Sequence, residues 1–217
     1  MTAPPPSRRW SARATFFAVV SACAVLAEAT DRWCFHHLAV PGIYDHGWAR
    51  LVRFAGYVPL WLLVGAGFLL SDWHPRRGAT LGRAGWRAWL LVGSAAAGGL
   101  VAEGLKLLCR RERPNLTDGA HVLRPWADQP FSSAQLGLPS SEVAVAFAAA
   151  AILARLLPRA WVLWYGLAWA CALTRVVSGA HFASDALVGA LVGFGVGTLL
   201  WERAAPQREG TGTERAA

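Results

Sequence analysis

Six apolar segments alternate with polar segments along the 217-residue chain, and this alternation limits the folds that the chain can adopt. Each segment approaches the length of a helix that crosses a bilayer, roughly 20 residues. The segments run at about residues 14–29, 51–70, 88–108, 141–157, 160–177 and 183–200. We therefore predict an all-α, polytopic membrane protein built as a bundle of six transmembrane helices. Gly189, Gly193 and Gly197, spaced by four, predict one helix face that packs tightly against a neighbour.

The composition also indicates a membrane protein. The chain is 55% apolar and 16% charged, with twelve tryptophans, which is too apolar for an ordinary soluble domain. The net charge of +8 is high, but the arginines cluster between apolar segments instead of along one basic face, so we expect no nucleic-acid partner. The four cysteines follow no CxxC spacing, and neither a zinc site nor a disulfide framework is indicated.

The first apolar segment can be interpreted in more than one way. Ala27-Glu28-Ala29 resembles a signal-peptide cleavage site, and Val20-Ser21-Ala22-Cys23 resembles a lipobox. Because several apolar segments follow, we favour a first transmembrane helix. Residues 31–50, with Pro41-Gly42 and several aromatic residues, are expected to form an extramembrane loop.

The positions of the arginines predict the orientation in the membrane. If both termini are cytoplasmic, the positive-inside rule is met by Arg8, Arg9, Arg13, Arg76, Arg77, Arg83, Arg87, Arg155, Arg159, Arg203 and Arg208. This divides the chain into a cytoplasmic segment 1–13, a membrane domain 14–202 and a disordered cytoplasmic tail 203–217. The long loop 109–138 then faces away from the cytoplasm, and we expect the protein in the cell inner membrane or the plasma membrane.

Three polar clusters lie on that outer face, at the predicted ends of spans three to six. In chain order they are Lys106-x6-Arg113-Pro114, Pro139-Ser140-Ser141-Glu142 and Arg175-x5-His181-x3-Asp185. Their order and spacing resemble the signature of the type 2 phosphatidic acid phosphatase (PAP2) superfamily, which is K-x6-RP, PSGH or PSSH, and SR-x5-H-x3-D. Membrane lipid phosphatases of that family have six spans, and the resemblance implies a phosphatase-like membrane domain here.

The resemblance also implies roles for individual residues. The family's histidine that matches His181 attacks phosphorus to give a phosphohistidine, which water hydrolyses with no metal or other cofactor. The predicted catalytic residues are His181, Asp185 and Glu142. The predicted phosphate-binding residues are Lys106, Arg113, Ser140, Ser141 and Arg175.

These residue types suit phosphoryl transfer on physical grounds as well. The transferred group spreads negative charge over its oxygens, and arginine and lysine side chains can stabilise that charge. A helix that begins at Ser140 would add free N–H groups and its dipole. His181 and Asp185 share a face if a helix has begun there, so the carboxylate can fix the tautomer and leave the other imidazole nitrogen as the nucleophile.

Glu142 departs from the family pattern, because a histidine is expected at this position. In the family that histidine protonates the leaving oxygen. Glutamic acid can do so only if its pKa is raised, and burial acts in that direction while nearby cations and the helix N-terminus act against it. We expect the pKa of Glu142 to be lowered, which makes it an anion inside an anion site.

Several functions are therefore open from the sequence. The chain could be a lipid phosphatase for a substrate with a good leaving group, such as a polyprenyl diphosphate, or one in which His121 of the long loop donates the proton. It could be a catalytically weak relative that binds lipid headgroups or partners, or a phosphotransferase. An unrelated transporter or channel is the remaining alternative, since charges at span ends also mark such proteins. Arg110, Arg111 and Arg124 match no motif position and are expected to contact the loop or lipid headgroups.

Overall fold

Helices make up nearly all of the regular structure in the computed structural model, which describes residues 6–73 and 85–204, with side chains from residue 21 onward. The α-helices are α1 (Pro6–Leu38), α2 (Gly47–Arg53), α3 (Val58–Asp72), α5 (Trp86–Cys109), α6 (Ser141–Leu156), α7 (Trp161–Val177) and α8 (Ala183–Ala204). The short 3-10 helices are η1 (Ile43–Asp45), η2 (Phe54–Gly56), η4 (Pro114–Leu116) and η5 (Pro158–Ala160). No strand occurs in the described part of the chain, so the predicted all-α class is confirmed there.

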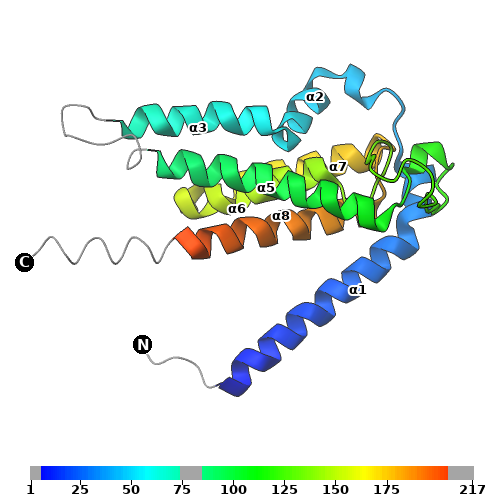
Figure 1. Ribbon diagram of the computed structural model, residues 1–217, viewed down its shortest axis with the longest axis horizontal. Helices are drawn as coiled ribbons and strands as arrows, with labels where there is room; N and C mark the ends of the chain where they lie inside the picture. Colours follow the sequence, from blue (N-terminus) through cyan, green and yellow to red (C-terminus); the bar gives the residue numbers. More distant parts are fainter. Residues whose placement is uncertain (1–5, 74–84, 205–217) are drawn as a thin grey trace, which may run out of the picture.

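The centre of the bundle is α6, which packs against α5, α7 and α8. Its side chains from Val143 to Leu153 are all buried. A helix that is apolar on every side needs neighbours on every side, and α6 has them. Figure 1 shows α3, α5, α6 and α8 side by side along the long axis, whereas α1 leans away and meets the bundle near its C-terminal end.

The glycines of α8 allow its close approach to α6. A Cβ added at Gly189 would lie 2.5 Å from the carbonyl oxygen of Ser140, and one at Gly197 would lie 2.8 Å from that of Ala148. Gly193, between them, faces the carbonyl of Ala144. The tight-packing face predicted from this spacing is confirmed.

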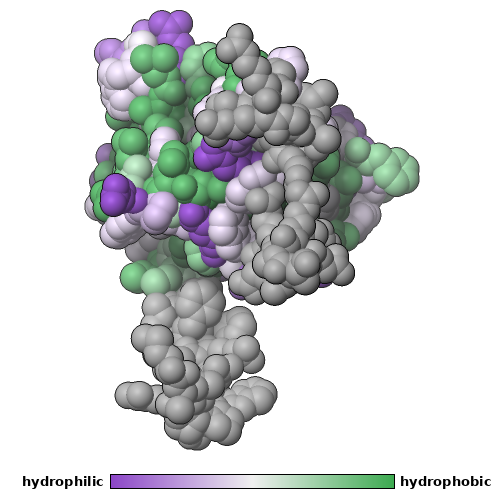
Figure 2. Space-filling model, turned by 90° about the vertical axis from the view of Figure 1, so that its left-hand side faces the viewer, coloured by the Kyte–Doolittle hydropathy of each residue, from purple (hydrophilic) through white to green (hydrophobic). Residues whose placement is uncertain are grey.

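Fewer spans are supported than the six predicted. Among the described residues, three helical segments are long and apolar enough to cross a membrane: Trp86–Cys109, Pro158–Val177 and Ala183–Ala204. The pair Gly47–Gly56 and Val58–Asp72 would make a fourth span, bent by 73°. The central helix α6 has only 16 residues. Hydrophobic residues cover much of the described surface in Figure 2, which is viewed from the end where α8 finishes.

Two segments differ from their predicted structure. The second span was expected to run straight over residues 51–70, but the chain is extended at Tyr57 (φ −108°, ψ 126°), and α3 starts anew at Val58. Pro59 suits the first turn of this new helix, where its missing N–H has no helical partner to lose. Residues 31–50 were expected to be a loop, but α1 continues to Leu38 because no helix breaker precedes Pro41.

Some of the arginines from which the membrane orientation was predicted lie outside the residues that the structure describes. These are the side chains of Arg8, Arg9 and Arg13, the residues Arg76, Arg77, Arg83 and Arg208, and most of the tail 203–217. Arg203 still belongs to α8, which ends at Ala204.

Candidate functional site

His181 lies in the short turn between α7 and α8, and only 2% of its surface is exposed. Its Nδ1 atom is 3.0 Å from the carbonyl oxygen of Gly137 and 3.7 Å from a carboxylate oxygen of Asp185. Both neighbours are acceptors, so Nδ1 carries the proton and donates to the Gly137 carbonyl. This tautomer leaves the Nε2 lone pair free to act as a nucleophile.

The surroundings of His181 favour its neutral form. Burial, assisted by the positive charges of Arg175 and Arg113, lowers the pKa of His181 to about 4, although the nearby Asp185 carboxylate acts in the opposite direction. The imidazole is therefore neutral at pH 7, with its one proton on Nδ1, and Nε2 keeps the lone pair that a nucleophile requires.

Asp185 is fully buried in the first turn of α8. One of its oxygens pairs with the guanidinium of Arg111, and the other accepts a hydrogen bond of 2.9 Å from the backbone N–H of Phe182. The sequence predicted that Asp185 orients His181. In the structure the Gly137 carbonyl is the closer acceptor, and Asp185 also holds the turn that carries the histidine.

Lys106 and Arg113, both predicted to bind phosphate, have different partners in the structure. Lys106, in the last turn of α5, donates to Glu103 at 2.7 Å and to the hydroxyl of Ser141 at 3.0 Å. Arg113 donates to the carbonyl of Leu136 at 3.4 Å and makes no ion pair within the described residues. Burial and the nearby Arg175 lower the pKa of Arg113, and the carboxylates of Glu142 and Glu103 only partly offset this effect.

Glu142 is bound on both sides by arginines. Arg53 of α2 donates to both carboxylate oxygens, from Nε at 3.1 Å and from Nη2 at 2.9 Å. Arg175 of α7 places its Nε 3.0 Å from Oε2, although without hydrogen-bond geometry for that N–H. A carboxylate between two guanidinium groups is favoured in its ionised form, as the sequence predicted for this position.

The third predicted phosphate-binding feature is the start of α6. Ser140 is fully buried, and its hydroxyl has no hydrogen-bond partner in the part of the chain that the structure describes. Its backbone N–H donates to the carbonyl of Asp185 at 3.0 Å, which joins the starts of α6 and α8. The first N–H groups of α6, next to Lys106, are available to an anion.

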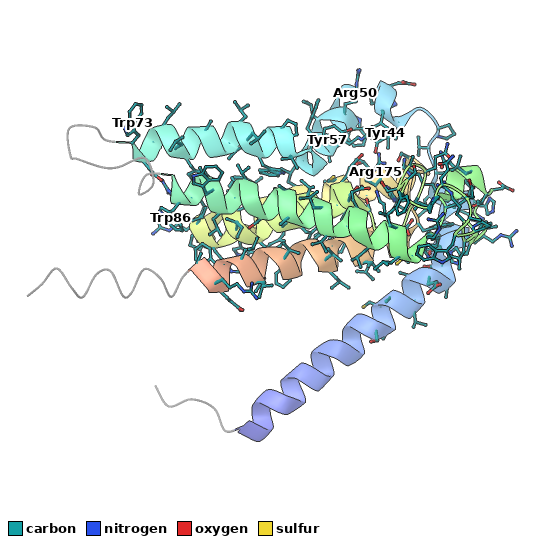
Figure 3. The ribbon with its side chains drawn as sticks, viewed as in Figure 1. Tyr44, Arg50, Tyr57, Trp73, Trp86 and Arg175 are labelled. Atoms are coloured by element: carbon teal, nitrogen blue, oxygen red, sulfur yellow. The ribbon has the colours of Figure 1, made fainter. Side chains whose placement is uncertain are left out.

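A pocket of about 270 Å³ opens beside these groups. We call it the arginine pocket; it is lined by Val40, Gly42, Ile43, Tyr44, Arg53, Arg113, Arg175, Ser178 and Ala180. The hydroxyl of Tyr44 accepts a hydrogen bond of 3.0 Å from Arg175 and donates one of 3.2 Å to the carbonyl of Thr174. Figure 3 places Tyr44, Tyr57 and Arg175 together at one end of the bundle, opposite Trp73 and Trp86.

The structure brings together residues from all three predicted clusters, because Arg113 and Arg175 share the pocket, Arg175 contacts Glu142, and Lys106 contacts Ser141. Four side-chain cations in this region, Arg53, Lys106, Arg113 and Arg175, face two carboxylates, Glu103 and Glu142, so a net positive charge remains. Such a region can bind a multiply charged anion.

His121, considered as a proton donor, lies elsewhere. Its Nε2 is 3.2 Å from a carboxylate oxygen of Asp31, and its ring packs edge-on against Phe182. It does not line the arginine pocket. The structure therefore gives His121 contacts with α1 and no contact with Glu142 among the described interactions.

The three arginines without a motif position were expected to contact the loop or lipid headgroups, and Arg110 and Arg124 do contact the loop. Arg110 donates to the carbonyls of Arg124 and Pro125, at 3.0 and 2.9 Å, and so ties the loop together. Arg124 donates to Glu112 at 3.2 Å. Arg111 pairs with Asp185, and all three guanidinium-bearing residues are buried.

Sequence reasoning missed Arg53, although a signal was present. It is the one charged residue in the apolar segment 51–70, where a charge is costly and is usually functional. Tyr44 and the Gly137 carbonyl gave no such signal, because their roles depend on backbone positions far away in the sequence. No group of three His, Cys, Asp or Glu side chains that could hold a metal ion occurs within residues 6–73 and 85–204.

Comparison with known proteins adds one finding. The sequence profile of the PAP2 superfamily matches residues 87–208, which is more than half of the chain and includes all three polar clusters. No curated protein and no solved structure matches the chain at a significant level.

Proposed function

The chain belongs to the PAP2 superfamily, whose members are generally phosphatases, and from this premise we propose that it hydrolyses a phosphate or diphosphate group of a membrane lipid. The observation that carries the proposal is the state of His181. Its Nδ1 is held as a donor by the Gly137 carbonyl, which leaves Nε2 as a neutral nucleophile beside two arginines.

The other motif residues have supporting roles in this proposal. Arg113 and Arg175 hold the phosphate oxygens, with Lys106 and the start of α6 at Ser140 and Ser141 as further donors. Nε2 of His181 attacks phosphorus, and the bond to the leaving oxygen breaks as the phosphohistidine forms. Water then attacks this intermediate and releases inorganic phosphate, and Nε2 regains its lone pair. No step requires a metal or another cofactor.

The position of the site supports a membrane lipid as the substrate. Apolar helices long enough to span a membrane end at the site, since α5 ends three residues after Lys106 and α7 ends two residues after Arg175. A phosphate at this level is reached most easily by a lipid headgroup. The positive-inside pattern supports a site on the extracytoplasmic side of the plasma or inner membrane, with both termini in the cytoplasm and six spans in total.

A phosphate-release assay tests the proposal. The purified full-length protein is given phosphatidate, phosphatidylglycerol phosphate and a polyprenyl diphosphate, beside His181→Ala and, as a control, the exposed His46→Ala. We expect release from at least one lipid, loss of that activity in His181→Ala, and no change in His46→Ala. Release by Glu142→His but from no lipid by the wild type would contradict the proposal.

A second function is favoured by one observation. Glu142 already engages Arg175 and Arg53, so the site holds an internal anion where a substrate phosphate would bind. A catalytically weak relative that binds lipid headgroups would have this feature. Binding of vesicles that contain phosphatidate, without turnover of any of the three lipids, would favour this second function over the first.

A further inference from the structure

Arg53 joins the site from outside the segment that matches the family. It lies at the end of α2, whereas the family match begins at residue 87. Its guanidinium forms a two-point ion pair with Glu142, which is the strongest arrangement available to these side chains. The pair therefore links a residue that the three motifs do not include to the motif position that departs from the family.

The position of Arg53 is fixed by aromatic rings. Its guanidinium carbon lies 4.8 Å from the ring centroid of Tyr44 and 5.3 Å from that of Tyr57. Tyr44 also contacts Arg175 through its hydroxyl group. Arg53, Glu142, Arg175 and Tyr44 thus form a closed network, and movement of one member disturbs the others.

We propose that Arg53 is a positioning residue that keeps Glu142 ionised beside Arg175, and that this pair restricts the enzyme to phosphoanhydride substrates, such as lipid diphosphates, over lipid phosphomonoesters. This inference rests on the phosphatase activity proposed above. In this inference, Arg53, which precedes the segment matched by the family, determines which leaving group the enzyme accepts.

The chemical reason is the proton that the leaving group needs. When Nε2 of His181 bonds to the terminal phosphorus, the P–O bond breaks and its electron pair stays on the leaving oxygen. In a monoester that oxygen becomes an alkoxide, which is about as basic as hydroxide and leaves readily only with a proton. In a diphosphate it becomes a phosphate, whose pKa is about 6, so it leaves without a proton. An ionised Glu142 has no proton to donate.

The first test compares two lipids with the same diacylglycerol body, phosphatidate and diacylglycerol diphosphate. We expect the wild type to prefer the diphosphate by about 100-fold or more in kcat/KM, the size of a typical general-acid contribution. In Glu142→His the preference should fall by about tenfold or more through a higher kcat for phosphatidate. Equal rates on the two lipids would overturn the inference and leave the phosphatase proposal standing.

The second test separates positioning from support of the fold. In Arg53→Gln, Glu142 takes up a proton at a higher pH, so phosphatidate hydrolysis should rise as the pH falls from 8 towards 5. This rise in phosphatidate hydrolysis at low pH should be absent in Arg53→Gln/Glu142→Gln and weak in Arg53→Lys, which keeps the positive charge. The control is Arg50→Gln, one turn earlier and exposed, with the wild-type profile expected. If Arg53→Gln lowers the hydrolysis rates of both lipids equally and leaves their pH dependence unchanged, Arg53 only supports the fold.

The third test needs no turnover and uses inorganic phosphate with the full-length protein in detergent. Without Arg53, Glu142 competes more strongly for Arg175, so the Kd for phosphate in Arg53→Gln should rise about tenfold. Arg53→Gln/Glu142→Gln should bind phosphate at least as tightly as the wild type. An unchanged Kd for phosphate in Arg53→Gln would overturn the inference, whether or not the wild type hydrolyses either lipid. Lack of hydrolysis by the wild type would refute the phosphatase proposal separately.

Discussion

Asp31 of α1 accepts a hydrogen bond of 2.9 Å from the backbone N–H of Ser184, at the start of α8. It also accepts one from the hydroxyl group of Ser184 and lies 3.8 Å from Arg111. Asp31 is fully buried, and Arg111 in turn pairs with Asp185. The leaning helix α1 is therefore joined by buried charges to the turn that carries His181.

Replacing Asp31 should destabilise the protein. Asp31→Ala leaves the Ser184 donors without a partner and removes one of the two carboxylates beside Arg111, which should cost about 3 kcal/mol of unfolding free energy. The measurement is the denaturation midpoint in detergent. Glu28→Ala is the control, because Glu28 lies in the same helix with its side chain 62% exposed. Equal midpoints for the two variants would contradict a structural role for Asp31.

Gly189 provides a test of the contact between α6 and α8. A Cβ there would lie 2.5 Å from the Ser140 carbonyl, and neither backbone can move without shifting a helix. We expect Gly189→Ala to lower stability by about 1–3 kcal/mol and to reduce phosphatase activity, since Ser140 starts α6 at the site. Gly195→Ala, in the same helix with open space around it, should be neutral or slightly stabilising. Thermal unfolding of both variants, with phosphate release, checks the prediction.

Gly56 plays a similar part on the other side of α6. A Cβ at Gly56 would lie 2.7 Å from the Cβ of Glu142 and 2.9 Å from its carbonyl oxygen. Gly56→Ala should therefore push η2 away from α6 and misalign Arg53 with Glu142, so that phosphate binding weakens about tenfold while the helices persist. Titration with inorganic phosphate measures this. Gly67→Ala, which has open space in α3, should bind phosphate like the wild type.

The sequence predicted the helices and the motif residues better than it predicted their partners. Apolar periods and fixed spacings are local, so the α-helical class and the glycine face of α8 were within reach. The meeting of Arg113 with Arg175 was expected from the placement of both at span ends on one membrane face and from the resemblance to the PAP2 signature. The bend at Tyr57 was not, because it depends on how α2 packs against α7 and on how η2 packs against α6. The pairing of Glu142 with Arg53 joins residues 89 positions apart, and no local pattern encodes such a contact.

Charge placement shows the same limit. Arg111 and Asp31 were assigned to loops, where arginine and aspartate are usually solvated. The structure buries both, because Arg111 lies between the carboxylates of Asp31 and Asp185 and offsets part of their charge at the junction of α1 and α8. A sequence can mark an arginine as unusual in an apolar segment, as it does for Arg53, but the acceptor must come from the fold.

His181 predicts how stability depends on pH. Its pKa is lowered from 6.5 to about 4 in the folded protein, chiefly by burial, so between these values the unfolded chain binds more protons than the folded one. The free energy of unfolding should therefore rise with pH from about 4 to about 6.5, and this contribution is lost as the pH falls through that range. Unfolding midpoints of the wild type and His181→Asn, measured in detergent from pH 4 to 8, check it. The difference between the unfolding midpoints of the wild type and His181→Asn should change between pH 4 and 6.5. The exposed His46→Asn should follow the wild type. Parallel curves for the wild type and His181→Asn would show that the imidazole takes up its proton as easily in the folded protein as in the unfolded chain.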